Sequence, residues 1–281
     1  MSVLPAKLLD RSGLAFSACV ALAFCGAFCG ASPAHAADAE AVTIDTTFTV
    51  KTPPVRLDKP AHEGRASVVL MTGGNGLLEL DATGTITNST GNFLIRSANL
   101  FLRHGLNVMM ADALPAHPTG HTFATRLSAA HAAELQGFIN AAVSRWNKPV
   151  WVVGTSNGSI STVTAAGFQP ALAGLKGVVL TSSVTQLTAG TQPTFNLYVS
   201  RITVPALVVW HEDDHCSFSP PAGSAALFAA IPSAEKASRT FEKGHSVATD
   251  PCGAFSEHGY AGIEERVVAR IAGFIHREDK H

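Results

Sequence analysis

The sequence predicts an α/β protein, a single domain built on a doubly wound, mostly parallel sheet with helices on both faces. Short apolar runs alternate with helical patterns from about residue 66 onward. Strands that are covered on both faces are near-continuous apolar runs of this kind. No internal repeat, low-complexity tract or linker divides the chain. A chain of 281 residues is long enough for one large domain with a well-buried core.

The N-terminus has the pattern of a secretory signal peptide. Two basic residues precede an apolar, uncharged run at 14–28, and residues 34–36 read Ala-His-Ala, a small-x-small cleavage pattern. This predicts a signal peptide at 1–36 and a mature domain at 37–281. The apolar run is short for a bilayer span, so we expect an exported protein, periplasmic or secreted, without a membrane span after signal removal.

The first half of the domain is predicted to contain two strands and two helices. Residues 38–65 are more polar and β-like, which suggests edge strands or an N-terminal arm. Each strand is an apolar run, and the helices carry apolar residues at helical spacing, the first one ending at Gly105. In chain order we expect a strand at 67–71, a helix at 93–104, a strand at 106–110 and a helix at 126–146.

The second half continues the alternation. Lys148 and Pro149 begin a strand that leads to Ser156, and a run without helix breakers follows it. Residues 181–203 are too few for a large lid domain, so we expect them to form a loop beside an open site. The remaining elements are a helix at 159–166, a strand at 177–180, a strand at 206–210, a helix at 221–231, a strand at 239–241 and a helix at 263–275.

A serine stands at the turn between a predicted strand and a predicted helix. The five residues Gly154-Thr155-Ser156-Asn157-Gly158 match the G-x-S-x-G pattern of a nucleophile elbow. Glycines two positions either side of the serine allow a tight turn and leave the hydroxyl accessible. An ordinary glycine- and serine-rich loop has the same pattern, so the interpretation depends on finding partners for Ser156 elsewhere.

Serine is a poor nucleophile unless a base takes its proton and an acid orients that base. The strand at 206–210 is followed by His211-Glu212-Asp213-Asp214-His215. A carboxylate at the carboxyl end of this strand can reach a histidine on the next loop. We favour Asp214, which stands where the loop turns inward, with Asp213 as the alternative and Glu212 less favoured.

Two histidines qualify as the base. His245 follows the last predicted strand, and His258 precedes the terminal helix. The base of such a site lies on the loop between these two elements, so both remain open. We favour His258, because its distance to the terminal helix suits the fold better, and keep His245 as the alternative.

Backbone N–H groups must stabilise the negative charge that develops on the substrate oxygen. One is expected from Asn157, which follows the serine at the start of its helix. A second is expected from the glycine loop Thr72-Gly73-Gly74-Asn75-Gly76, after the first core strand. Gly74 is the favoured donor and Asn75 the alternative. A phosphate-binding loop is disfavoured, because the Walker lysine and the full G-x-G-x-x-G spacing are missing.

We expect neither a metal nor a cofactor. The remaining histidines are interpreted as structural or solvent-facing, because no pair combines metal-ligand spacing with acidic ligands. With signal removal, the mature chain keeps two cysteines, and in an exported protein these predict one disulfide. The bridge would tie the acid loop to the base loop. The histidines concerned are His104, His117, His121, His131 and His211, and the cysteines are Cys216 and Cys252.

The charge pattern excludes several classes of partner. The formal net charge is −1, only 15% of residues are charged, and the basic residues are scattered. Nothing in this pattern suggests binding to nucleic acid, an acidic partner or a membrane surface. We expect a small-molecule substrate.

From about residue 66 to 277 the chain resembles the α/β-hydrolase superfamily. The resemblance is carried by the glycine loop, the serine elbow, Asp214 and His258, in that order. It is nearest to compact, lid-poor members such as dienelactone-hydrolase-like and esterase-like proteins. One departure is Thr72, which stands where many relatives have histidine.

The resemblance implies that Ser156 is the nucleophile, His258 the base and Asp214 its orienter. Our hypothesis is a serine hydrolase that cleaves carboxylic esters without a cofactor. The same triad serves peptidases, amidases and thioesterases, and a non-catalytic binding protein can retain the scaffold, so these remain alternatives.

Overall fold

The structure is a computed structural model that describes residues 39–43, 54–60, 63–81, 83–113 and 115–280. The predicted signal peptide at 1–36 lies outside the described residues. No helix in the described part of the chain combines the length and apolar character that a membrane crossing requires.

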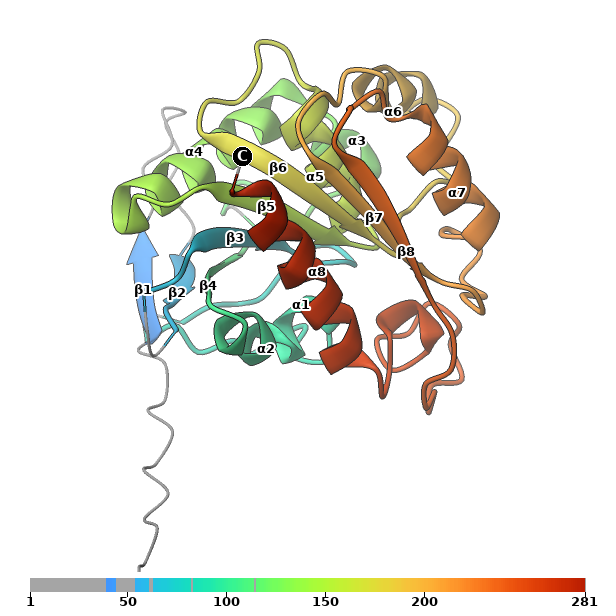
Figure 1. The fold of residues 1–281 in the computed structure, drawn as a ribbon, viewed down its shortest axis with the longest axis horizontal. Coiled ribbons are helices and arrows are strands. Elements are labelled where there is room, and N and C mark those ends of the chain that lie inside the picture. The colour runs from blue at the N-terminus through green and yellow to red at the C-terminus, as the bar shows by residue number, and fades with distance from the viewer. Residues whose placement is uncertain (1–38, 44–53, 61–62, 82, 114, 281) are drawn as a thin grey trace, which may run out of the picture. The chain divides into compact units, whose positions relative to one another are not determined.

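An eight-stranded sheet forms the centre of the fold, in the order β1-β2-β4-β3-β5-β6-β7-β8 (Figure 1). The six strands from β3 to β8 pair in parallel, whereas β1 and β2 are antiparallel at one edge. The strands are β1 (Ala39–Thr43), β2 (Pro54–Asp58), β3 (Ala66–Met71), β4 (Leu106–Ala111), β5 (Val150–Thr155), β6 (Leu175–Thr181), β7 (Ala206–His211) and β8 (Lys236–Phe241).

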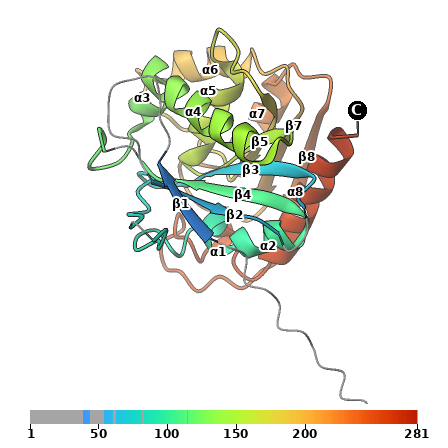
Figure 2. The ribbon, with the colours of Figure 1, turned by 90° about the vertical axis from the view of Figure 1, so that its left-hand side faces the viewer.

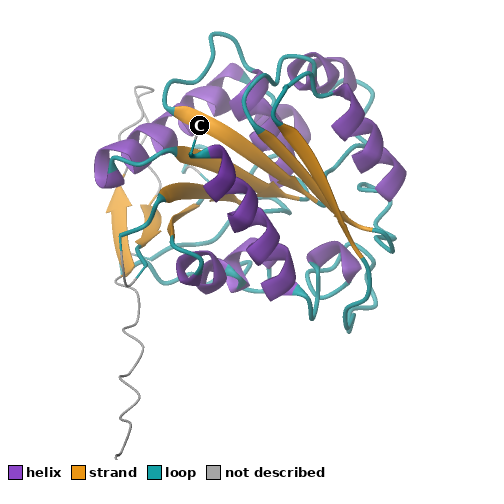
Figure 3. Cartoon of the chain, in the orientation of Figure 1, coloured by secondary structure: helices purple, strands orange, loops and turns teal. Residues whose placement is uncertain are grey.

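Helices cover both faces of the sheet, as Figures 2 and 3 show. One face packs against α4, α5, α6 and α7, and the other against α1, α2 and α8. The helices are α1 (Phe93–Arg96), α2 (Ala98–Arg103), α3 (Phe123–Arg126), α4 (Ala129–Trp146), α5 (Gly158–Gly167), α6 (Gln192–Val199), α7 (Pro221–Ala230) and α8 (Glu264–Glu278), with a short 3₁₀ helix, η1, at Glu257–Gly259.

Alternate residues of the central strands divide the core into two layers. Val150 and Val152 of β5 pack under α4 and α5, while Trp151 and Val153 point to α8 on the other face. All four side chains are fully buried. Because both faces are covered, all four residues from Val150 to Val153 are apolar, which is the pattern that predicted the doubly wound sheet. That prediction is confirmed.

The structure differs from the predicted elements in several places. The helix expected at 93–104 is broken at Ser97 into α1 and α2. The helix expected at 126–146 starts later, because Ser128 caps α4 by accepting a hydrogen bond from the backbone N–H of His131. The stretch at 181–203 contains α6, which places Phe195 in the core.

Candidate active site

Ser156 lies in the sharp turn between β5 and α5, with a left-handed backbone (φ 52°) that is unfavourable for a residue with a side chain. Both flanking glycines are required by close packing. A Cβ atom at Gly154 would overlap Thr162, and one at Gly158 would overlap the carbonyl oxygen of Met71. The elbow is therefore held against the end of β3 by a contact that only glycine permits.

Asp214 and His258 meet at the carboxyl end of the sheet. The carboxylate oxygen Oδ2 of Asp214 lies 2.9 Å from Nδ1 of His258, and both side chains are almost fully buried. Asp214 follows β7, and its other oxygen accepts a hydrogen bond from the backbone N–H of Cys216 at 2.9 Å. His258 lies on η1, just before α8. The ring nitrogen Nε2 has no hydrogen-bond partner among the described residues.

The two alternative residues lie elsewhere. His245 is exposed, and its backbone N–H donates to the carbonyl of Ala261. The side chain of Asp213 is also exposed and faces His211, with 3.9 Å between its carboxylate and the ring Nδ1. Of these four residues, the structure pairs only Asp214 with His258.

A cavity of about 250 Å³ joins the serine to the histidine. Ser156 and His258 both line it, together with Gly73 and Gly74 of the glycine loop. Its far wall comes from the segment before α1 and from the loop that carries Cys252. The remaining lining residues are Ser89, Gly91, Asn92, Phe93, Thr155, Ala254 and Gly259.

The glycine loop is fastened to the elbow. The side-chain amide of Asn157 donates to the carbonyl of Gly74 at 2.9 Å, and Gly74 has φ +59°. Asn75 does not line the cavity, and its carbonyl accepts a hydrogen bond from the backbone N–H of His121. In the described part of the chain, the backbone N–H groups of Gly74 and Asn157 donate no hydrogen bond. Both N–H groups are therefore available as hydrogen-bond donors.

The sequence did not indicate the serine that completes the contacts of His258. The Ser219 hydroxyl lies 2.9 Å from Nδ1 of His258 and 3.1 Å from Oδ2 of Asp214, and it is fully buried. Ser182 donates to the carbonyl of His258 at 2.7 Å. Burial raises the pKa of the Tyr260 phenol, which stays a hydrogen-bond donor to the carbonyl of Val209. Loop serines follow no period, so only the fold reveals them.

The disulfide between Cys216 and Cys252 is present. It joins the loop after β7 to the loop before η1, two residues beyond Asp214 and six residues before His258. Both loops on which the hydrogen-bonded pair lies are therefore covalently linked. The bond also removes Cys216 as a thiolate ligand, although the residue lies close to the acid and the histidine.

One interpretation from the sequence was incomplete. The fold brings His117 and His121 together with Glu134 of α4, so a histidine pair does have an acidic neighbour. This contact is hard to predict from the sequence, because it forms between a loop and a helix that begins several residues later.

Comparisons with known proteins identify structures but no sequence relatives. No protein-family model matches the chain, and no curated protein matches it. Among solved structures, Est1E from Butyrivibrio proteoclasticus has a TM-score of 0.60 at 15% identity over 86% of this chain and 100% of its own. The dienelactone hydrolase from Anabaena variabilis has a TM-score of 0.59 at 14% identity, covering 86% and 99%.

The Pyrococcus furiosus esterase Pf2001 gives a similar result, with a TM-score of 0.58 at 14% identity over 86% of this chain and 93% of its own. At such low identity the likeness concerns the fold. The strand order, the layers and these neighbours agree, and the chain has the fold of the α/β-hydrolase superfamily.

Proposed function

We propose that this protein is an exported serine hydrolase that cleaves carboxylic esters through an acyl-enzyme. The observation that carries the proposal is the shared cavity: Ser156, in a left-handed turn, lines it together with His258, which is hydrogen-bonded to buried Asp214. A nucleophile, a base and an acid that orients the base are the groups that this chemistry requires.

In the first half-reaction, Ser156 Oγ bonds to the ester carbonyl carbon while Nε2 of His258 accepts the hydroxyl proton. The negative charge that develops on the carbonyl oxygen is stabilised by the free backbone N–H groups of Asn157 and Gly74. The bond from carbon to the alcohol oxygen then breaks, and the alcohol leaves with the proton from His258.

The second half-reaction repeats these steps with water. His258 removes a proton from water, whose oxygen bonds to the acyl carbon. The ester bond to Ser156 then breaks, and the serine takes the proton back from the histidine. Asp214 keeps the histidine in the tautomer with its proton on Nδ1 and stabilises the imidazolium form in both halves. The carboxylic acid is released, and no cofactor takes part.

Two further features are in accord with this proposal. The solved structures of similar fold include proteins named as esterases and a dienelactone hydrolase. Export through the predicted signal peptide suits the Cys216–Cys252 disulfide, because disulfides persist in oxidising compartments.

A fluorophosphonate probe tests the proposal. We expect the wild-type protein to be labelled at Ser156 and to hydrolyse p-nitrophenyl acetate, and Ser156→Ala to lose both properties while its melting temperature stays close to wild type. Ser217→Ala, which changes an exposed serine, is the matched control and should be labelled normally. Equal labelling and hydrolysis by Ser156→Ala would refute the proposal. Faster turnover of a matched p-nitroanilide or thioester would move the substrate class from esters to amides or thioesters.

A further inference from the structure

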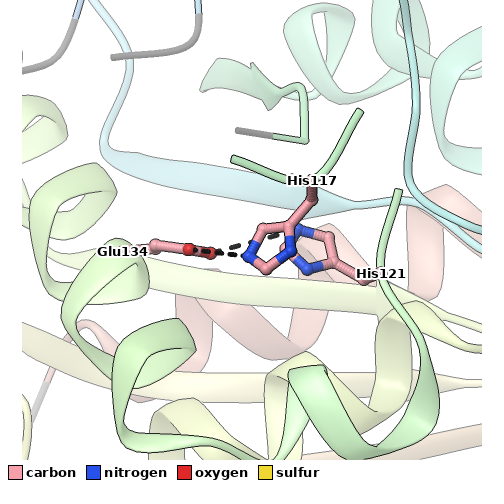
Figure 4. Close-up of side chains that lie close together, drawn as sticks. All are labelled: His117, His121 and Glu134. Atoms are coloured by element: carbon pink, nitrogen blue, oxygen red, sulfur yellow. Dashed lines mark ion pairs between the residues drawn. The ribbon is translucent and has the colours of Figure 1, made fainter. Parts of the chain in front are cut away.

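Outside the cavity, two histidines and a glutamate converge in what we call the histidine–glutamate cluster, consisting of His117, His121 and Glu134 (Figure 4). Nε2 of His117 lies 3.3 Å from Oε1 of Glu134, and Nε2 of His121 lies 3.9 Å from Oε2. The two histidines come from the loop at 115–122, and the glutamate comes from α4. The two histidines thus face different oxygens of the carboxylate.

The cluster is buried on one side and open on the other. The side chains of Glu134 and His121 are 7% and 5% exposed, whereas that of His117 is 23% exposed. A ligand could therefore enter past His117.

The spacing of the three side chains is close to that of the ligands of one cation. Zn²⁺ binds nitrogen and oxygen ligands at about 2.0–2.2 Å in a tetrahedron, which places neighbouring ligand atoms roughly 3.3–3.6 Å apart. The 3.3 Å separation of His117 from Glu134 falls within this range. The 3.9 Å separation of His121 from Glu134 is too long for a hydrogen bond and slightly exceeds the range, so the His121 ring would have to shift slightly to bind the same ion. Neither ring nitrogen of His121 has a hydrogen bond among the described residues, and Nδ1 is buried.

Groups around the cluster hold its carboxylate in place. Nδ1 of His131 lies 2.8 Å from Oε2 of Glu134, and Nε2 of the same ring lies 2.8 Å from the hydroxyl of Ser161 on α5. Such outer contacts orient the ligands of metal sites. Arg126 donates to Ser161 as well, and its charge opposes a cation, so it lowers the metal affinity.

The loop that carries the histidines is fastened to the glycine loop beside the cavity. The side-chain amide of Asn75 donates to the carbonyl of Thr119 at 3.0 Å, and the backbone N–H of His121 donates to the carbonyl of Asn75 at 2.7 Å. A Cβ atom at Gly120 would overlap Asn75. An ion in the cluster would therefore hold this loop against α4. Through the contacts of Asn75, it would also restrain the glycine loop.

We propose that His117, His121 and Glu134 bind one divalent transition-metal ion, with Zn²⁺ the best match to two imidazoles and a carboxylate. Water completes the coordination on the open side of His117. The ion is structural: it fixes the loop at 115–122 and takes no part in the reaction proposed for Ser156.

Metal titration of the tag-free, disulfide-bonded protein tests this site after dialysis against a chelator. We expect one Co²⁺ per chain to bind with visible absorption bands of four-coordinate geometry, and Zn²⁺ to displace it and raise the melting temperature. His117→Ala and Glu134→Gln should each weaken binding about tenfold or more. The side chain of His117 is partly exposed, so we expect His117→Ala to fold. This variant therefore still tests the site if Glu134→Gln fails to fold.

Glu265→Gln is the matched control, because Glu265 also faces a histidine, His104, at 3.0 Å, but on the surface and without a third ligand. It should bind Co²⁺ like wild type. Binding that is unchanged in His117→Ala, binding that is lost equally in Glu265→Gln, or no stoichiometric binding would each overturn the proposal. All these readouts are independent of hydrolysis, so loss of the proposed activity in Ser156→Ala leaves them unaffected.

Discussion

Ser219 places its hydroxyl 2.9 Å from Nδ1 of His258, the same nitrogen that Asp214 engages at 2.9 Å. The serine also lies 3.1 Å from the carboxylate, so the three groups form a closed triangle. Because this triangle is buried, each contact restricts the rotation of the imidazole. We therefore expect Ser219 to be a positioning residue, which acts through the histidine.

Removal of this hydroxyl should slow turnover without destroying the site. We expect Ser219→Ala to lower kcat/KM for p-nitrophenyl acetate about 2- to 10-fold, the equivalent of one hydrogen bond of about 0.5–1.5 kcal/mol. The loss should fall on kcat, because Ser219 does not line the cavity. Ser217→Ala, in the same loop but exposed, should show wild-type kinetics. An effect confined to KM would argue against a positioning role.

Replacing each of the two candidate bases by alanine should show which histidine is the base. His258→Ala should lower kcat by about 10⁴-fold or more, because a triad that loses its base retains only the contribution of binding and the oxyanion site. His245→Ala, at an exposed position, should retain wild-type kcat. Steady-state kinetics on both purified variants, with circular dichroism to check folding, decides the matter. The reverse result would assign the base to His245.

Reduction of the disulfide should affect both stability and activity. Loss of a bridge of this kind costs about 2–5 kcal/mol, and here it also frees the two loops that position Asp214 and His258. We expect dithiothreitol to lower the melting temperature and kcat of the wild type. The double variant Cys216→Ser/Cys252→Ser should start at these lower values and not respond to the reductant. An unchanged melting temperature in fully reduced wild type, with reduction confirmed by mass, would contradict this view.

Two glycines should respond to alanine in opposite directions. At Gly158 the added methyl group overlaps the backbone carbonyls of Met71 and Thr72, so Gly158→Ala should destabilise the fold by about 1–3 kcal/mol. At Gly273, in α8, nothing lies within 4 Å of the added carbon. Gly273→Ala should therefore stabilise by about 0.5–1 kcal/mol through helix propensity. Urea unfolding of both variants measures the difference, and equal shifts would show that the elbow tolerates a side chain.

The size of the cavity predicts a preference for small acyl groups. Its volume of about 250 Å³ is below the roughly 300–1,000 Å³ of pockets that enclose drug-sized ligands. We expect kcat/KM to be highest for acetate and butyrate esters of p-nitrophenol and to fall for the decanoate. A rise with chain length, measured below the micelle concentration of each ester, would place the acyl group outside this cavity.

The central strands could be predicted from the sequence because each one is marked by its own short apolar run. Trp151 and its neighbours in β5 form an apolar run that fits a buried strand better than any other buried element. α6 was missed, because only Phe195, Tyr198 and Val199 of its eight residues are buried and the surrounding segment is polar. Such a short helix forms through its contacts with α5 rather than through its own pattern.

Site residues that directly follow a buried strand could be predicted from their order in the chain. Residues that reach the site only through contacts between distant parts of the chain could not. Ser156 and Asp214 follow buried strands, and parallel strands end at one edge of the sheet. The two histidines lie on one loop, and only the path of that loop separates buried His258 from exposed His245. Ser219 and Glu134 acquire their neighbours through tertiary contacts, which no spacing rule encodes.

The Cys216–Cys252 bond also makes a covalent ring out of one end of the sheet. All of α7 and β8 lie within this ring, and β8 is the outermost strand on its side (Figure 1). Unpaired edge strands are the places where two molecules join by strand addition or exchange. While the ring is closed, β8 cannot peel off and insert into a second molecule without carrying both anchoring loops along. We therefore expect the oxidised protein to resist strand exchange at this edge.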